Sequence, residues 1–173
     1  MWAVLKKEFK TYFLSPIGYV FVGVFLAIFS ILFYITIIQQ GVTTFQYLFY
    51  YAVMYSVIFV IPLLTMRMFS EERKTGTEQL LITSPRSMTA ITLGKFFGAV
   101  LVILIPIILT FVYLGILCYF KTPDMPTVFA SMFGFLLVSM TYISLGMFIS
   151  SLTENQIISA IATIATFILT WLA

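Results

Sequence analysis

The segment IGYVFVGVFLAIFSILFYITII, residues 17–38, decides the fold class. It contains no charged side chain, and Ser15 and Pro16 before it form a favourable N-cap and first-turn pair. A helix rises about 1.5 Å per residue, so a segment of this length can cross the roughly 30 Å hydrocarbon core of a bilayer. The sequence therefore predicts a membrane-spanning helix at this position.

The composition of the whole chain extends this interpretation. Of its 173 residues, 62% are hydrophobic and only 9% are charged, whereas soluble domains carry roughly 25% charged residues. A single soluble domain of this size has too much surface for its volume to bury so many apolar side chains. We therefore expect lipid to be the solvent around most of the chain.

Four more apolar segments are candidate spans: residues 48–66, 96–120, 128–149 and 157–173. The last has 17 residues, at the lower limit for a span, and the chain stops there. This abrupt stop predicts a truncation at the C-terminus of a longer protein. We expect one transmembrane domain over residues 1–173, an all-α polytopic bundle of about five transmembrane helices.

The basic residues indicate the orientation. Eight of the nine lie either before the first span or in the loop of residues 67–95. Lysine and arginine are retained on the cytoplasmic side of membrane proteins. The sequence therefore predicts a cytoplasmic N-terminus and a cytoplasmic loop between the second and third spans.

Residues 1–14 have the pattern of an amphipathic helix. Two aromatic residues, Trp2 and Phe9, fall on one helical face, and Lys6, Lys7 and Lys10 fall on the other. This segregation predicts an interfacial helix, with its apolar face in the bilayer and its lysines toward the lipid headgroups. The alternative is an ordinary basic flank that only sets the orientation of the first span.

Several kinds of chemistry have no residues to support them. The sequence contains no histidine, one cysteine (Cys118), no phosphate-binding GxxxxGK[ST] loop and no HExxH motif. Its basic residues form no stripe with exposed aromatic side chains, which argues against nucleic-acid binding. We expect no catalytic residues, no metal site and no bound cofactor. Because the predicted spans also lack interior charges, energy for transport would have to enter from outside the bilayer.

The loop between the second and third spans is the best candidate for that entry. Its stretch SEERKTGTEQLLITSP, residues 70–85, holds five of the fifteen charged residues. Gly76 would allow a chain reversal, and Thr77 with Glu78 would begin a short helix that ends at Pro85. Leu80 and Leu81 on that helix would need a cover of lipid or protein. Alternatively, the loop is charged simply because it is in water.

The order of residues in this loop resembles the signature of type-2 ABC exporter permeases. The residues that carry the resemblance are Glu72, Gly76, Thr77, Glu78, Leu80, Leu81, Pro85, Gly94 and Lys95. The opening LKKEFKTYFLSPIGYVF is also similar to the first part of that family, closest to its gliding-motility-associated subgroup. That family has six spans, one more than expected here.

The resemblance implies the membrane subunit of an ATP-driven exporter in the inner (cytoplasmic) membrane of a prokaryote. Two permease subunits, identical or homologous, would pair in the bilayer, and separate ABC ATPase subunits would bind ATP and Mg on the cytoplasmic side. Glu71, Glu72 and Arg73 would lie at the ATPase contact, and Thr77 to Leu81 would form the coupling helix. Two other classes stay open: a non-transporting membrane scaffold that anchors a cytosolic protein, and an ion-coupled carrier.

Overall fold

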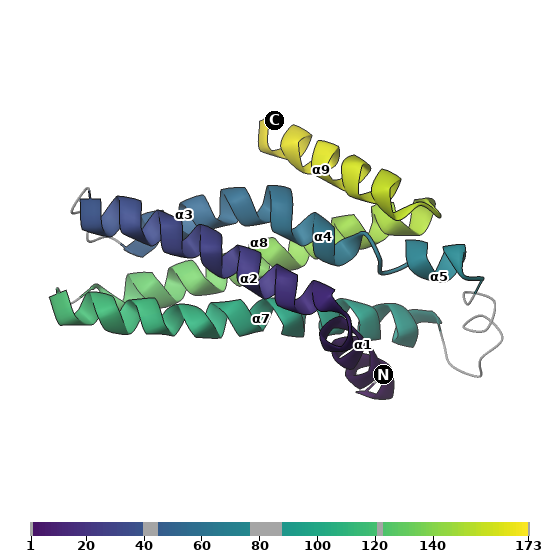
Figure 1. The fold of residues 1–173 in the computed structure, drawn as a ribbon, viewed down its shortest axis with the longest axis horizontal. Helices are drawn as coiled ribbons and strands as arrows, with labels where there is room; N and C mark the ends of the chain where they lie inside the picture. The colour runs from purple at the N-terminus through teal and green to yellow at the C-terminus, as the bar shows by residue number, and fades with distance from the viewer. Residues whose placement is uncertain (1, 40–44, 77–87, 121–122, 173) are drawn as a thin grey trace.

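A computed structural model describes residues 2–39, 45–76, 88–120 and 123–172. These residues form helices and no strand, which confirms the predicted all-α membrane bundle (Figure 1). In chain order the elements are α1 (Trp2–Leu14), α2 (Pro16–Phe33), η1 (Tyr34–Gln39), α3 (Phe45–Tyr55), η2 (Ser56–Val60), α4 (Ile61–Thr65), α5 (Ser70–Lys74), α7 (Met88–Phe120), α8 (Met125–Leu152) and α9 (Gln156–Leu172), where η marks a π-helix.

The longest helices form the membrane-crossing part of the bundle. Within the described ranges, Pro16–Ile37, Met88–Tyr119 and Met125–Leu152 are long and apolar enough to cross a bilayer, and Gln156–Leu172 is a shorter apolar helix. Helix α7 begins at Met88, so the final residues of the expected loop 67–95 form its first two turns. Lys95 consequently lies within a helix.

The segment expected as the second span is divided into three consecutive pieces, α3, η2 and α4. Proline has no backbone N–H, so Pro62 cannot donate the regular helical hydrogen bond to a residue four positions earlier. Next to it, the N–H of Ile61 donates to the carbonyl of Ser56, five residues back. The wider π-type turn is the local form of the helix at this proline.

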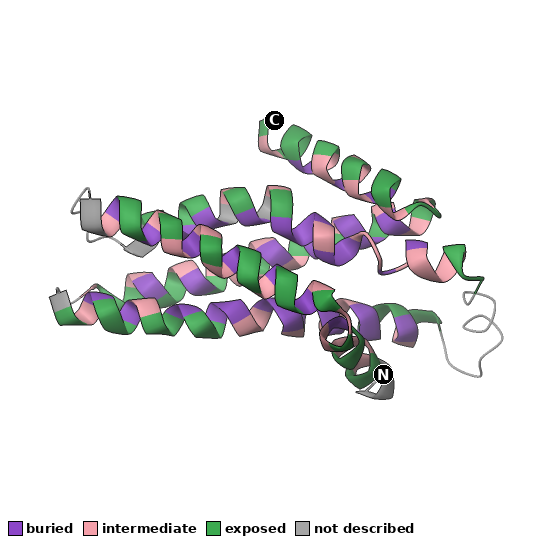
Figure 2. Ribbon diagram, viewed as in Figure 1, coloured by how far each residue is buried: buried purple, intermediate pink, exposed green. Residues whose placement is uncertain are grey.

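Aromatic side chains occupy the centre of the bundle. Phe21, Phe25, Phe29 and Phe33 recur at every fourth position of α2 and are all buried (Figure 2). The ring centroid of Phe29 lies 5.6 Å from that of Phe49 on α3 and 5.2 Å from that of Tyr113 on α7. These separations are typical of favourable aromatic pairs. One face of α2 therefore packs against both neighbouring helices.

Small residues let the helices approach closely at two places. A Cβ atom at Gly146 of α8 would lie 2.4 Å from Oγ1 of Thr65 on α4, and one at Gly98 of α7 would lie 3.0 Å from Cβ of Glu8 on α1. Both glycines belong to pairs with small-xxx-small spacing, which favours such approaches in membranes.

Helix α9 packs against the bundle with one face. Its buried residues Ser159, Thr163 and Phe167 recur at every fourth position. The ring of Phe167 packs edge-on against Tyr142 of α8, with the centroids 4.6 Å apart. A large aromatic side chain and two hydroxyl residues thus form the contact face of α9.

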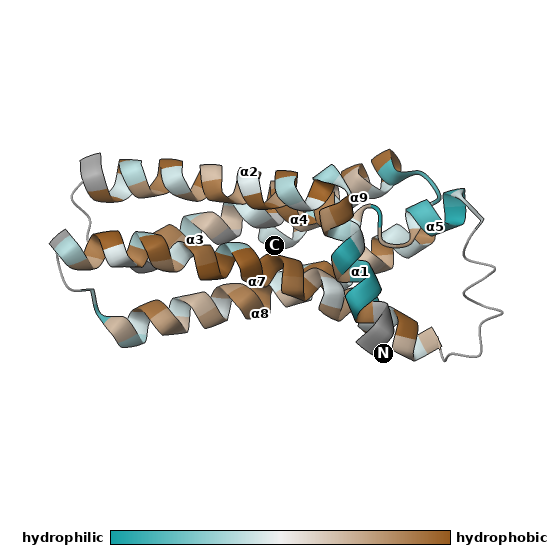
Figure 3. Cartoon of the chain, turned by 60° about the horizontal axis from the view of Figure 1, so that its bottom comes forward, coloured by the Kyte–Doolittle hydropathy of each residue, from teal (hydrophilic) through white to brown (hydrophobic). Residues whose placement is uncertain are grey.

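Most of the described charged residues collect at one end of the bundle. In Figure 3, α1 and α5 carry hydrophilic residues, whereas the long helices α7 and α8 are mainly hydrophobic. At this end α1 packs against α7, and α5 packs against α8 and α9. The charged side chains of three separate parts of the sequence are thereby brought together.

Candidate functional site

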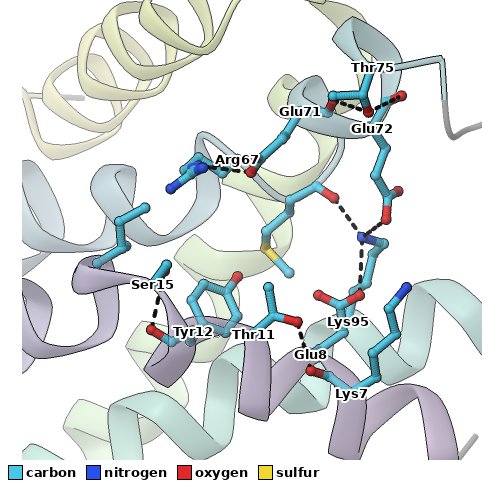
Figure 4. A pocket seen from close by; sticks show the side chains of 12 residues that line it. Lys7, Glu8, Thr11, Tyr12, Ser15, Arg67, Glu71, Glu72, Thr75 and Lys95 are labelled. Atoms are coloured by element: carbon cyan, nitrogen blue, oxygen red, sulfur yellow. Dashed lines mark hydrogen bonds and ion pairs between the residues drawn. The ribbon is translucent and has the colours of Figure 1, made fainter.

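The candidate site is built around Lys95, a charged residue that is only 2% exposed. Its ammonium donates to the Glu72 carboxylate and to the Met68 carbonyl, each at 2.7 Å from Nζ. The Glu8 carboxylate lies 3.5 Å away on α1 (Figure 4). Nζ also lies 5.2 Å from the centroid of the Phe69 ring. We call Glu8, Glu72 and Lys95 the Lys95 cluster.

The cluster balances the cost of burying a cation. An isolated ammonium group loses its hydration when it is buried, and this loss is tolerated only when opposite charges and hydrogen-bond acceptors replace the water. The Glu8 and Glu72 side chains are 14% and 19% exposed, so both carboxylates lie nearer to solvent than the ammonium does. The cluster therefore joins α1, α5 and α7 through one buried charge.

Ser150 makes a second connection, from the last turn of α8. Its Oγ accepts hydrogen bonds from the backbone N–H groups of Phe69 and Ser70, each at 3.2 Å. It also lies 3.3 Å from the Met66 carbonyl, to which it can donate. The first N–H groups of a helix have no partner inside that helix. Ser150 thus caps α5 from another helix and ties α8 to the start of the charged segment, residues 66–76.

Glu71 borders the same cavity as Glu72 but has a different partner. Its two carboxylate oxygens accept from Nε and Nη2 of Arg67, at 2.8 and 2.6 Å. The two side chains are 29% and 42% exposed, and exposed pairs of this kind contribute only about 0.3–0.5 kcal/mol. The pair orients the charged segment more than it stabilises the fold, and Glu71 remains accessible from outside.

A cavity of about 360 Å³ separates α1 from α5 (Figure 4). Three cationic and three anionic side chains line it: Lys7, Arg67, Lys95, Glu8, Glu71 and Glu72. Within the described ranges, no group of three or more histidine, cysteine, aspartate or glutamate residues could hold a metal ion. The lining instead suits a set of ion pairs that hold two surface helices against the bundle.

The other coupling residues expected from the sequence lie in different surroundings. Arg73 lines a second hollow, between α5, α7 and α8, so the run Glu71, Glu72, Arg73 is divided between two sides of α5. Gly76 has a φ of +70°, a conformation that glycine adopts readily, and the course of the chain after it lies outside the described residues. The residues expected to form the coupling helix, namely Thr77, Glu78, Leu80, Leu81 and Pro85, lie outside the described residues.

Helix α1 contains the residues expected at the membrane interface. Lys6, Lys7 and Lys10 are exposed, in agreement with their place on the polar face. Phe9 is partly buried against the core of the same chain. Trp2 belongs to α1, but its side chain lies outside the described residues. Much of the apolar face of α1 therefore packs against its own bundle, which the sequence pattern did not indicate.

Glu8 is the member of the Lys95 cluster that the sequence interpretation does not single out. The amphipathic pattern of residues 1–14 rests on lysines and apolar residues, and it places Glu8 on neither face. At 100° per residue, Glu8 lies about 40° from Tyr12, at the edge of the apolar face. A single carboxylate at that edge is the signal that could have predicted a buried basic partner.

Tyr12 seals the bundle side of this site. It is buried, and its hydroxyl donates to the Leu64 carbonyl of α4 at 3.3 Å. Burial raises the pKa of Tyr12 well above its ordinary value of 10.0, and the Glu8 carboxylate raises it further. Both effects disfavour the phenolate.

We expect Tyr12→Phe to destabilise the protein by about 1 kcal/mol at pH 7, because it removes one hydrogen bond. Since the pKa of folded Tyr12 is raised, the stability from the neutral phenol is fully present below pH 10 and is lost as the pH rises further. The difference between wild type and variant should therefore shrink above pH 10. Thermal unfolding in detergent from pH 7 to pH 11 measures it; a constant difference would contradict the prediction.

The family comparison agrees with this architecture. The model of the ABC-2 family transporter protein matches residues 38–173, well over half of the chain. No curated protein and no solved structure matches the chain. The matched range contains Glu72, Lys95 and Ser150, whereas α1 with Glu8 precedes it. With its apolar spanning helices and this match, the chain is a multi-pass membrane protein that belongs to the ABC-2 family of transporter proteins.

Proposed function

We propose that this chain is the membrane-spanning permease subunit of an ATP-driven exporter. A separate ATPase subunit binds the region around residues 67–95, carries ATP and Mg, and moves the membrane helices through that region. The family match supports a permease role. The direction of transport and the involvement of a separate ATPase are inferred from the resemblance of the loop to exporter permeases. Membership of the gliding-motility subgroup stays a prediction.

The observation that carries the proposal is the attachment of the charged segment to three helices. Lys95 joins it to α7, Glu8 reaches the same ammonium from α1, and Ser150 caps it from α8. Packed interiors do not deform continuously, so a displacement of α5 would be passed on to these helices as a movement of whole elements. A loop that was charged only because it is exposed to water would not require these buried contacts.

The orientation is part of the proposal. The described basic residues Lys6, Lys7, Lys10, Arg67, Arg73, Lys74 and Lys95 belong to α1, the charged segment and the second turn of α7. Basic residues favour the cytoplasmic side. We therefore assign the N-terminus and the charged segment to the cytoplasm, where an ATPase would dock. Two permease subunits would pair in the membrane, and Thr77 to Leu81 would form the docking helix.

The proposal predicts that docking and transmission can be separated by mutation. Leu81→Asp should abolish binding of the ATPase. Ser150→Ala should preserve binding but lower permease-stimulated ATP hydrolysis by at least about fivefold, because the segment loses hydrogen bonds of about 1 kcal/mol each. Co-purification measures the first effect, and phosphate release in proteoliposomes containing both subunits measures the second.

Thr141→Ala is the matched control, since its exposed hydroxyl donates only to the Leu137 carbonyl in its own helix. It should leave both binding and hydrolysis unchanged. An ATPase that binds without any stimulation in the wild-type complex would overturn the exporter and support a scaffold. Transport that survives ATP depletion but stops when the ion gradient collapses would instead support a carrier.

A further inference from the structure

A laterally open groove lies between α5, α7 and α8, on the side of α5 away from the Lys95 cluster. Its volume is about 580 Å³, within the range of roughly 300–1,000 Å³ that is typical of ligand pockets. Its apolar lining consists of Phe69, Leu93, Phe96, Met147 and Phe148. Phe148 and Leu93 are 63% and 46% exposed, so these side chains leave the groove open.

The polar residues of the groove lie mainly toward one end. Arg73 is on α5, Thr92 is in the second turn of α7, and Ser151 is in the last turn of α8. From Ser151 the groove continues along α8 to Ser144, seven residues away, a length of about 10 Å. This is roughly two-thirds of one bilayer leaflet, which is about 15 Å thick. The groove thus has a charged end at the membrane surface and an apolar part at the depth of the lipid tails.

We propose that this groove binds an anionic phospholipid, with the phosphate at Arg73 and one acyl chain along Phe96, Met147 and Phe148. A guanidinium has five donors in a planar fork that suits phosphate oxygens, and it can serve one partner while it binds another. Basic pockets between membrane helices on the cytoplasmic side are typical sites for anionic headgroups. The cytoplasmic side is taken here from the proposed function.

The depth of the groove favours a lipid over a protein partner. Residues 144–151 belong to α8, which is long and apolar enough to span the bilayer, so the apolar part faces the hydrocarbon region. A cytosolic subunit could reach only the end with Arg73. The hydroxyls of Thr92 and Ser151 donate to their own helix, which leaves their oxygens as acceptors for headgroup hydroxyls.

The test is lipid retention by the full chain, purified without an ATPase so that it does not depend on transport. Native mass spectrometry would measure how many molecules of phosphatidylglycerol and of phosphatidylcholine, with identical acyl chains, remain bound to the protein. We expect wild type to retain phosphatidylglycerol preferentially, and Arg73→Gln to lower this retention about fivefold, as for the loss of one cationic contact with anionic lipid. Lys74→Gln, which removes the exposed neighbouring charge, should leave it unchanged.

A second pair of variants tests the apolar part. Leu93→Trp fills the groove and should displace the lipid whatever its headgroup, whereas Leu137→Trp, at a comparably exposed site of α8 outside the groove, should not. Equal retention of the two lipids, or equal losses in Arg73→Gln and Lys74→Gln, would overturn the site. A dimer that Leu93→Trp dissociates without loss of lipid would show that a second copy occupies the groove instead.

Discussion

Replacement of Lys95 by methionine is expected to lower the free energy of unfolding by about 3–5 kcal/mol, the usual effect of removing one partner from a buried ion pair. Methionine fills much of the same volume, so the loss comes mainly from charge. Glu8 and Glu72 would face each other without the ammonium that now lies between them. Equilibrium unfolding in detergent micelles, followed by circular dichroism, measures this loss.

Two further variants make this prediction specific. Addition of Glu72→Gln to Lys95→Met should recover part of the lost stability, because it removes a negative charge that has lost its buried ammonium in the single variant. Lys10→Met changes an exposed lysine of α1 and should alter stability by less than about 0.5 kcal/mol. Similar losses of unfolding free energy in Lys95→Met and Lys10→Met would mean that the Lys95 cluster contributes no more to stability than an ordinary surface charge.

Gly146→Ala is expected to be the second most damaging change, with a loss of about 1–3 kcal/mol. The new Cβ would lie 2.4 Å from Oγ1 and 2.8 Å from Cβ of Thr65. Thr65 is fully buried and short, so it cannot turn away, and α4 would have to move from α8. The midpoint of thermal unfolding in detergent should fall accordingly.

Gly134 provides the matched control on the same helix. A Cβ at this position would have no neighbour within 4 Å. Gly134→Ala should therefore gain stability, by up to about 1 kcal/mol, because alanine is the better helix former. Thr65→Ala should partly restore the stability of Gly146→Ala, since it removes Oγ1 and Cγ2 of Thr65 and leaves only its Cβ near the new side chain. Equal effects at the two glycines would contradict the close approach of α4 and α8.

Hydropathy predicted the helical bundle well, because the absence of charge over about 20 residues is a property of the local sequence. The same criterion assigned Lys95 to a loop in water, where an isolated ammonium would be expected. In the structure it belongs to α7 and is buried, because carboxylates from α1 and α5 compensate its charge. This compensation depends on residues far apart in the sequence, and no local pattern displays it.

The second predicted span illustrates a different limit. Apolar composition over residues 48–66 indicates membrane depth but does not specify the hydrogen-bonding pattern along the helix. The π segment before Pro62 is set by where the missing N–H falls relative to the neighbouring carbonyls. A proline marks such a position in the sequence, but composition alone does not distinguish a kink, a break and a wider turn.

The candidate site was predictable in part. The order of residues 70–76 indicates a charged run followed by a reversal; the charged run forms α5, and Gly76 has the positive φ that a reversal would use. The sequence could not show that Glu71 and Glu72 bind inside the chain while Arg73 faces another hollow. In a five-residue helix, neighbouring positions point in different directions, so adjacent charges need not act together.

The phenylalanines of α2 have a consequence for how this helix is held in place. Lipid tails are as apolar as the interior of the bundle, so rotation of α2 about its axis would cost little hydrophobic free energy. Shape and hydrogen bonding must then select the face that points inward. The Ser30 and Tyr113 hydroxyls lie 2.5 Å apart and share a hydrogen bond beside the ring of Phe29. This polar contact and the aromatic contacts of Phe29 together favour one rotational angle of α2, which the apolar solvent alone would not select.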